Sequence, residues 1–178
     1  MRVLAIDPGM DSSGYVVLDT KTSGLPRKGI VRNGSLLLAL RTMTGDVVDH
    51  IVCERIASYG MSVAQGVHDT SWWSGRFVEA AHPVPFAMLF RKKVKCHLCG
   101  VTNAKDSNVR QAIIDRYGGK AAAIGLKKSP GPLYGVKSHM WAALAVALTW
   151  ADEYAAATAQ SSTPQPPFPH HEAKGSVA

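Results

Sequence analysis

The chain has 178 residues, of which 46% are hydrophobic, and it carries a formal net charge of +7 at pH 7. This length is enough for one hydrophobic core and short for two independent domains. No apolar stretch reaches the roughly 18 residues of a membrane-spanning helix, and the N-terminus does not read as a signal peptide, so we expect a cytoplasmic protein without a membrane partner. The three cysteines are too few and too unevenly spaced for a disulfide framework.

The positive charge is concentrated in the second half of the chain. Residues 86–137 hold eleven lysines and arginines and only two acidic residues, a net charge of +9, which leaves about −2 for the remainder. This asymmetry favours a polyanionic partner, most often nucleic acid, over a merely soluble basic surface.

The N-terminal half reads mainly as strands. RVLAIDPG and YVVLDT are short apolar runs on either side of a turn-rich segment, which predicts a β-hairpin. GIVRNGSLLLAL predicts a third strand and a short helix, and DHIVCERI predicts a strand that is apolar until Glu54. Apolar spacing over residues 62–82 then predicts a helix, with Asp69 or Thr70 as its N-cap.

The second half predicts one more strand and two more helices. PVPFAMLF reads as a strand with RKKVK at its end, and Cys96 and Cys99 are expected on or near that strand rather than in a zinc site. Residues 103–119 predict a helix capped by Asp106 or Ser107, followed by a loop rich in glycine, proline and lysine. The apolar residues 135–152 predict a buried helix with Ser138 as its cap.

This order of elements predicts an α/β protein with a mixed sheet, led by antiparallel strands and covered by the later helices. Asp7 and Glu54 each stand where an apolar strand ends. Carboxylates held at strand ends can face a common cleft and ligate a divalent cation, although each alone is as consistent with a turn or a surface acid. His139 stands at the start of the buried helix.

Four segments in this order carry a resemblance that covers residues 1–154. They read LAIDPGMDSSGYVVLD, HIVCERIASYGM, AKDSNVRQAIIDRYG and SHMWAALAVALTWAD. Together they resemble the RuvC family of Holliday-junction resolvases, within the ribonuclease H-like nucleases, and look closest to its phage and prophage branch. The resemblance implies a ribonuclease H-like fold, with a mixed five-stranded sheet flanked by helices. Residues 1–154 would form the nuclease domain, and residues 155–178 a proline-rich tail unlikely to fold alone.

The resemblance also implies a site and an activity. Asp7, Glu54 and His139 match metal-ligating, catalytic positions of the family, which would bind a pair of Mg²⁺ or Mn²⁺ ions. Ala142 falls where the family has a further aspartate. The implied activity is that of a crossover-junction endodeoxyribonuclease, which hydrolyses phosphodiesters of four-way DNA junctions in DNA recombination and repair. A junction needs two symmetric nicks, so we expect a homodimer.

The expected DNA contacts follow the basic segments that flank the site in the family layout. They are Arg91, Lys92, Lys93, Lys127, Lys128 and Lys137. Tyr59 or Met61, just after Glu54, could wedge between base pairs, or could pack on the protein itself. The helix with Trp72, Trp73 and Phe77 is the candidate dimer contact, with packing inside the chain as the alternative.

Three alternatives stay open at this stage. Ala142 is compatible with a catalytically impaired protein that binds branched DNA without cutting it. A phage nuclease that cuts flaps or forks would share the same residues. His139 could also be a capping or core histidine rather than a ligand.

Overall fold

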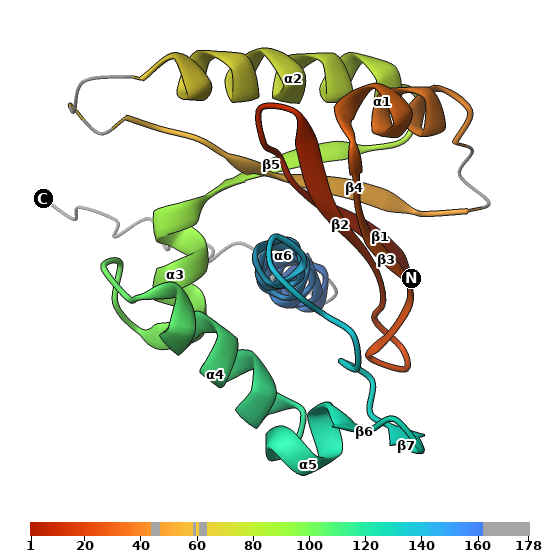
Figure 1. Cartoon of the computed structure of the whole chain (residues 1–178), viewed down its shortest axis with the longest axis vertical. Helices are drawn as coiled ribbons and strands as arrows, with labels where there is room; N and C mark the ends of the chain where they lie inside the picture. The colour runs from red at the N-terminus through yellow and green to blue at the C-terminus, as the bar shows by residue number, and fades with distance from the viewer. Residues whose placement is uncertain (44–46, 59, 61–63, 162–178) are drawn as a thin grey trace, which may run out of the picture.

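Five strands form the central sheet of the computed structural model, which describes residues 1–43, 47–58, 60 and 64–161 (Figure 1). The strands are β1 (Arg2–Asp7), β2 (Ser12–Asp19), β3 (Gly24–Arg32), β4 (His50–Arg55) and β5 (Phe86–Phe90). Their order in the sheet is β3-β2-β1-β4-β5, with β1, β2 and β3 antiparallel and with β4 and β5 parallel to β1. The predicted opening hairpin and the predicted mixed five-stranded sheet are confirmed.

Helices cover both faces of this sheet, so the strands are buried from two sides (Figure 1). One face packs against α1 (Asn33–Arg41) and α2 (Gln65–Ala81), and the other against α6 (Met140–Ser161), beside which lie α3 (Arg91–Cys99) and α4 (Asp106–Arg116). Alternate residues of β1 belong to different cores: Val3 and Ala5 pack on the α6 side, and Leu4 and Ile6 on the side of α1 and α2.

The same alternation fixes the side of the sheet on which each strand-end carboxylate lies. Asp7 follows Val3 and Ala5 in the two-residue period of β1, and therefore lies on the α6 side. In β4, Val52 packs on the α6 side and Cys53 on the other, which places Glu54 on the α6 side as well. One face of the sheet thus carries both acids.

Several predicted helix starts are wrong by a few residues. Helix α2 begins at Gln65, and the hydroxyl of Thr70 donates to the carbonyl oxygen of Gly66 inside the helix, so neither Asp69 nor Thr70 is the N-cap. Helix α4 has Lys105 at its N-cap position, which leaves Asp106 and Ser107 inside its first turn. Good capping residues stand near both helix starts, but neither helix has a side-chain hydrogen bond at its N-cap position.

The largest departure from the sequence-based prediction follows β5. RKKVK does not end a strand but begins helix α3, which also carries Cys96 and Cys99, and only Val94 of this helix is buried. A helix with one buried residue shows no apolar periodicity that could reveal it. The predicted loop after α4 contains the short helix α5 (Gly119–Ala123) and a two-stranded ribbon of β6 (Gly125–Leu126) and β7 (Ser129–Pro130).

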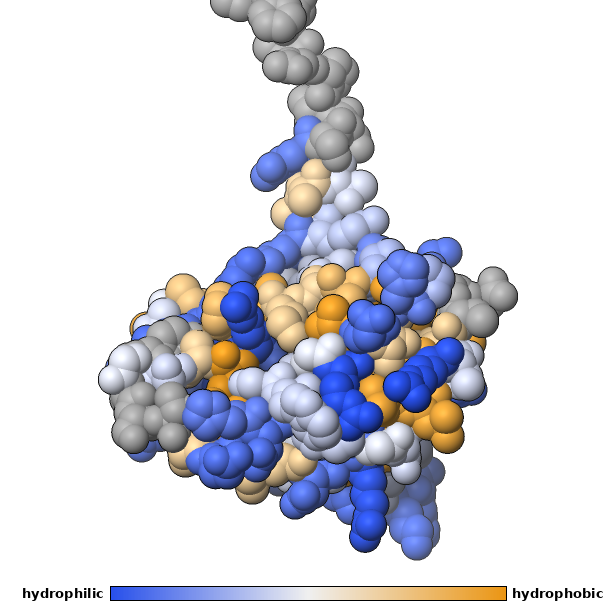
Figure 2. Space-filling model, turned by 90° about the horizontal axis from the view of Figure 1, so that it is seen from above, coloured by the Kyte–Doolittle hydropathy of each residue, from blue (hydrophilic) through white to orange (hydrophobic). Residues whose placement is uncertain are grey.

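Helix α6 is the buried helix that the sequence predicts, with a different start and end. The N–H of Ala143 donates to the carbonyl oxygen of His139, which puts His139 rather than Ser138 at the N-cap position. The helix continues to Ser161, past residue 154, and its C-terminal part extends beyond the body of the molecule (Figure 2). The rest of the predicted tail, residues 162–178, lies outside the described residues. Among the described helices, none is both long enough and apolar enough to cross a membrane.

The side chain of Asn33 stabilises the turn after Asp7 through hydrogen bonds. This buried first residue of α1 accepts a hydrogen bond from the hydroxyl of Ser13 at 2.7 Å. Its amide nitrogen donates to the carbonyl oxygens of Gly9 and Met10 at 2.8 and 3.0 Å. One side chain therefore satisfies three polar groups of the β1–β2 connection.

We expect Asn33→Ala to lower the free energy of unfolding by about 1–3 kcal/mol, because it removes these hydrogen bonds and leaves buried polar groups without a partner. Chemical denaturation measures the change. Asn108→Ala is the matched control, since this asparagine is exposed on α4. Equal effects of the two substitutions would contradict the anchoring role of Asn33.

Candidate active site

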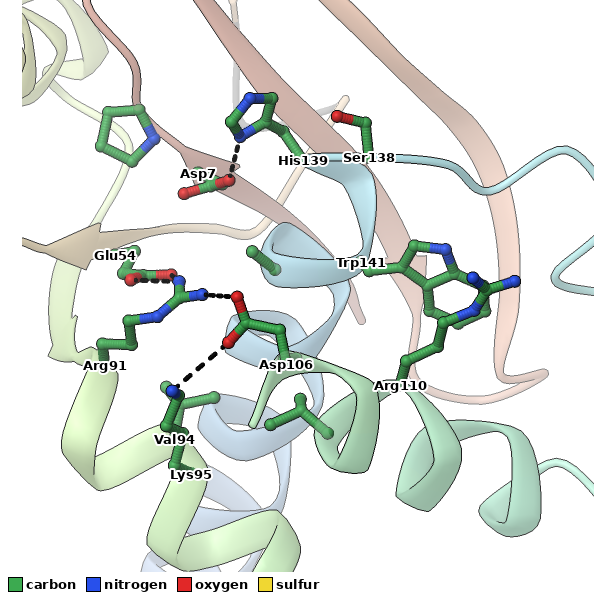
Figure 3. A pocket seen from close by; sticks show the side chains of 14 residues that line it. Asp7, Glu54, Arg91, Val94, Lys95, Asp106, Arg110, Ser138, His139 and Trp141 are labelled. Atoms are coloured by element: carbon green, nitrogen blue, oxygen red, sulfur yellow. Dashed lines mark hydrogen bonds and ion pairs between the residues drawn. The ribbon is translucent and has the colours of Figure 1, made fainter. Parts of the chain in front are cut away.

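The pairing of β1 with β4 brings Asp7 and Glu54 side by side. The two strands are parallel neighbours with Ile6 opposite Cys53, so the next residues of each strand are Asp7 and Glu54. Neighbouring strands lie about 4.8 Å apart, and both side chains are on the α6 face. Both line a pocket of about 410 Å³ between the sheet, α3, α4 and α6 (Figure 3).

Both residues are largely buried, with exposed side-chain fractions of 11% for Asp7 and 7% for Glu54. Burial raises the pKa of each carboxyl group, because the charged form loses its hydration, and the negative charge of Asp7 raises the pKa of Glu54 further. Two neighbouring buried acids can both be ionised only where positive charge is close. This is the electrostatic requirement that a divalent cation meets.

His139 lines the pocket from its position just before the first residue of α6. Its Nδ1 lies 2.9 Å from Oδ2 of Asp7, while 54% of its side chain is exposed, which is not the environment of a core histidine. Gly14 makes this approach possible. It lies opposite Asp7 in the β1–β2 pairing, and a Cβ atom on it would stand 2.6 Å from the carbonyl carbon and the Cβ of His139.

Ala142 also lines the pocket, so the start of α6 and the residue before it contribute His139 and no acid to it. The first acidic residue of α6 is Asp152, and it does not line the pocket. Its carboxylate accepts hydrogen bonds from Arg116 at 2.6 and 2.8 Å and lies 2.8 Å from Nε2 of His97. Those contacts tie α6 to α4 and α3, outside the pocket.

A third carboxylate, which the sequence-based analysis did not identify as a site residue, comes from α4. Asp106 lines the pocket, where its Oδ2 is 2.7 Å from Nη2 of Arg91 and its Oδ1 is 3.3 Å from Nζ of Lys95. Nη1 of the same arginine donates to both oxygens of Glu54, at 2.8 and 3.0 Å (Figure 3). The available signal was that Asp106 is one of only two acids in the basic segment 86–137.

The donor set of the pocket suits a hard divalent cation, since carboxylate oxygens suit Mg²⁺ and Mn²⁺ and an imidazole nitrogen suits Mn²⁺ better than Mg²⁺. Asp7, Glu54 and His139, the three predicted metal ligands, all line it. Within the described part of the chain, however, no three His, Cys, Asp or Glu side chains converge closely enough to form a metal centre. Glu54 has the guanidinium of Arg91 as its cationic partner instead.

Of the predicted DNA contacts that the structure describes, Arg91 alone lines the pocket. Lys92 and Lys93 are exposed on α3, where Lys93 pairs with Glu153 at 2.8 Å, and Lys137 is exposed two residues before His139. Lys127 and Lys128 are exposed in the turn between β6 and β7, beyond α5 (Figure 1). Tyr59 and Met61 lie outside the described residues, so the proposed wedge stays a prediction.

The aromatic residues of α2 divide between core and surface. Phe77 is fully buried in the core of this chain, and Trp73 packs against the same core. Trp72 is 59% exposed, and the guanidinium of Arg76 lies over both tryptophan rings. On the face of α1 and α2, hydrophobic and hydrophilic residues are interspersed (Figure 2). A dimer contact through this helix remains a prediction, and Phe77 would not take part in it.

The fold has close counterparts among solved structures. The chain superposes on the RuvC structure of Thermus thermophilus with a TM-score of 0.64 and 23% sequence identity, over 89% of this chain and 98% of that one. The T. thermophilus RuvC structure in complex with a Holliday junction substrate matches with a TM-score of 0.63 and the same identity, over 89% and 97% of the two chains. No protein-family model matches the chain, and no curated protein matches it significantly. The likeness shows a shared ribonuclease H-like fold.

We expect Gly14→Ala to move His139 away from Asp7, because the added methyl group has no room against the backbone of His139. The substitution should lower the melting temperature and shift the imidazole resonances of His139 in NMR spectra. Gly75→Ala is the control, since a Cβ there meets nothing within 4 Å, and alanine in a helix should stabilise by up to about 1 kcal/mol. Unchanged His139 resonances in the Gly14 variant would contradict this role.

Proposed function

We propose that this chain is a divalent-cation-dependent endodeoxyribonuclease that nicks four-way DNA junctions. The observation that carries the proposal is the meeting of two buried carboxylates from adjacent parallel strands with an imidazole from α6, in one pocket. The likeness of the fold to RuvC, which has been solved with a Holliday junction substrate, supports the choice of substrate.

Asp7 and Glu54 would hold Mg²⁺ or Mn²⁺, with His139 either as a third ligand or as the group that orients Asp7. When bound, a pair of such cations activates water and stabilises the leaving oxygen in phosphodiester hydrolysis. Arg91 and Lys95, at the edge of the same pocket, would attract the phosphate backbone of DNA.

Branched DNA fits the distribution of charge. The net charge of +9 over residues 86–137 comes from α3, α4, α5, the β6–β7 ribbon and the short segments next to them, all of which follow the sheet in the chain. α3 and α4 supply the bases that line the pocket, and further lysines of residues 86–137 are exposed. A homodimer with two such surfaces would place one pocket on each of the two strands that must be cut in a symmetric junction.

A second candidate function follows from two observations at the same pocket. Ala142 presents a methyl group where a further acid could stand, and Arg91 neutralises Glu54. A protein with these features could bind branched DNA without cutting it. The two candidates differ in one measurable property, which is the appearance of nicks in the presence of a divalent cation.

We expect the chain to nick a synthetic four-way junction in Mn²⁺, and Glu54→Gln to lower the nicking rate by at least about a hundredfold, since the amide cannot replace a charged ligand. Denaturing gel electrophoresis of end-labelled strands measures the rate. Glu79→Gln, an exposed acid on α2 across the sheet, should leave the rate unchanged. Flap and fork substrates assayed in parallel distinguish a junction resolvase from a nuclease of broader specificity.

The same assay on Ala142→Asp separates the two candidate functions. Nicking by the unaltered chain supports the enzyme. Tight junction binding without nicks in Mn²⁺ or Mg²⁺, with nicking gained only by Ala142→Asp, would mean that the chain is a disabled form that retains DNA binding.

We expect a severalfold higher rate in Mn²⁺ than in Mg²⁺, because an imidazole nitrogen is a better ligand for Mn²⁺. His139→Asp replaces that nitrogen with oxygen and should shift the preference towards Mg²⁺. The ratio of the two rates for each protein is the measurement. An unaltered chain that is as fast or faster in Mg²⁺ would count against His139 as a direct ligand.

A further inference from the structure

The pocket contains one more carboxylate than the two that the proposed function assigns as metal ligands. Its lining includes Asp106, the first residue of α4, opposite the sheet that carries Asp7 and Glu54 (Figure 3). The charge of Asp106 reaches both of those acids, since it contributes to raising the pKa of each. Asp106 is thus electrostatically part of the same group of carboxylates, although it comes from a different helix.

The contacts of the Arg91 side chain show that Asp106 and Glu54 lie close together. One planar guanidinium contacts both, with Nη1 at 2.8 Å from Oε1 of Glu54 and Nη2 at 2.7 Å from Oδ2 of Asp106. A single positive group therefore already bridges the strand side and the α4 side of the pocket. A bridging cation between carboxylates from two elements is the arrangement that a metal ion would take up.

We propose that Asp106 is a cation ligand of this pocket, contributed by α4 across from the position where α6 presents Ala142. Arg91 holds Glu54 and Asp106 together until a divalent cation displaces its guanidinium. This inference rests on the proposed function and adds to it a ligand that comes from none of the segments expected to supply one.

The side chains involved can make this exchange with little rearrangement. The two oxygens of Asp106 have separate partners, Lys95 for Oδ1 and Arg91 for Oδ2, so the exchange leaves the Oδ1 contact of Asp106 in place. Oδ2 of Asp106 and both oxygens of Glu54 would change partner. The side chain of Asp106 is 69% exposed and free of core packing, and that of Arg91 is 40% exposed, which leaves the guanidinium a path to solvent. Once displaced, its charge would be available to a DNA phosphate at the pocket edge.

The charges of the pocket also favour a third carboxylate ligand. Its ionisable lining consists of three acids, Asp7, Glu54 and Asp106, and three bases, Arg91, Lys95 and Arg110, besides His139. Because two divalent cations would add about +4 to this lining, each further carboxylate ligand lowers the electrostatic cost of binding them, and Asp106 is the third acid available.

The test is a titration of the whole chain with Mn²⁺ in the absence of DNA, in which electron paramagnetic resonance of free Mn²⁺ gives the number and affinity of bound ions. We expect two ions on the unaltered chain. Asp106→Asn should lose one ion or bind it at least about tenfold more weakly. Asp115→Asn is the matched control, since it removes the same charge from an exposed position on α4 and should bind as the unaltered chain does.

Two further variants separate ligation from a loss of charge or of fold. Arg91→Gln should bind Mn²⁺ more tightly, because the competing guanidinium is gone. Adding Ala142→Asp to Asp106→Asn should restore the second ion, because it returns a carboxylate to the pocket from α6. Thermal unfolding without Mn²⁺ shows that each variant is folded. The whole series is repeated at about 1 M salt, which screens through-space effects and spares direct ligands.

The outcomes distinguish this inference from the proposed function. Two ions bound by Asp106→Asn at the unaltered affinity would overturn the assignment of Asp106 alone. A loss that high salt abolishes, or that Asp115→Asn shares, would overturn it too, since either means that only net charge matters. No Mn²⁺ binding by the unaltered chain would instead contradict the cation-dependent function itself.

Discussion

The parallel pairing of β1 with β4 is the constraint on which the site depends. With Ile6 opposite Cys53, the residues that end the two strands must be neighbours on one face of the sheet. The same pairing buries both strands between two layers of helices, so the carboxylates stand at the edge of an apolar core and lose most of their hydration. The register of β1 against β4 therefore determines both the burial of the strands and the meeting of the two acids. If this register shifted by one residue, the side chain of one acid would point to the opposite face of the sheet.

Buried negative charge of this kind has to be balanced, and the pocket does so with side chains from helices that follow the sheet. Arg91 stands directly after β5, which is the parallel neighbour of β4, and this position delivers its guanidinium to Glu54. Asp106 and Lys95 then continue an alternating chain of charges away from the sheet. The pocket is thus nearly neutral before any cation binds, although its innermost groups are acids.

The sequence was informative where burial imposes a pattern and uninformative where it does not. The opening hairpin, the strand ending at Glu54 and the apolar final helix were predictable because each has an apolar side that must be covered. Helix α3 and the role of Asp106 were not, because α3 buries one residue and Asp106 reads equally well as a helix cap. Asp7, Glu54 and His139 could be singled out individually, but Arg91 between Glu54 and Asp106 depends on the relative placement of three elements.

The contact between His139 and Asp7 joins residues that are 132 positions apart in the chain. Strand β1 is the first element of the described chain and α6 the last, so the contact joins the two ends of the element order. A polypeptide that lacks α6 therefore contains all three acids of the pocket but not the side chains that α6 contributes to its lining. The order of the elements in the chain therefore makes the last described helix a requirement for completing the pocket.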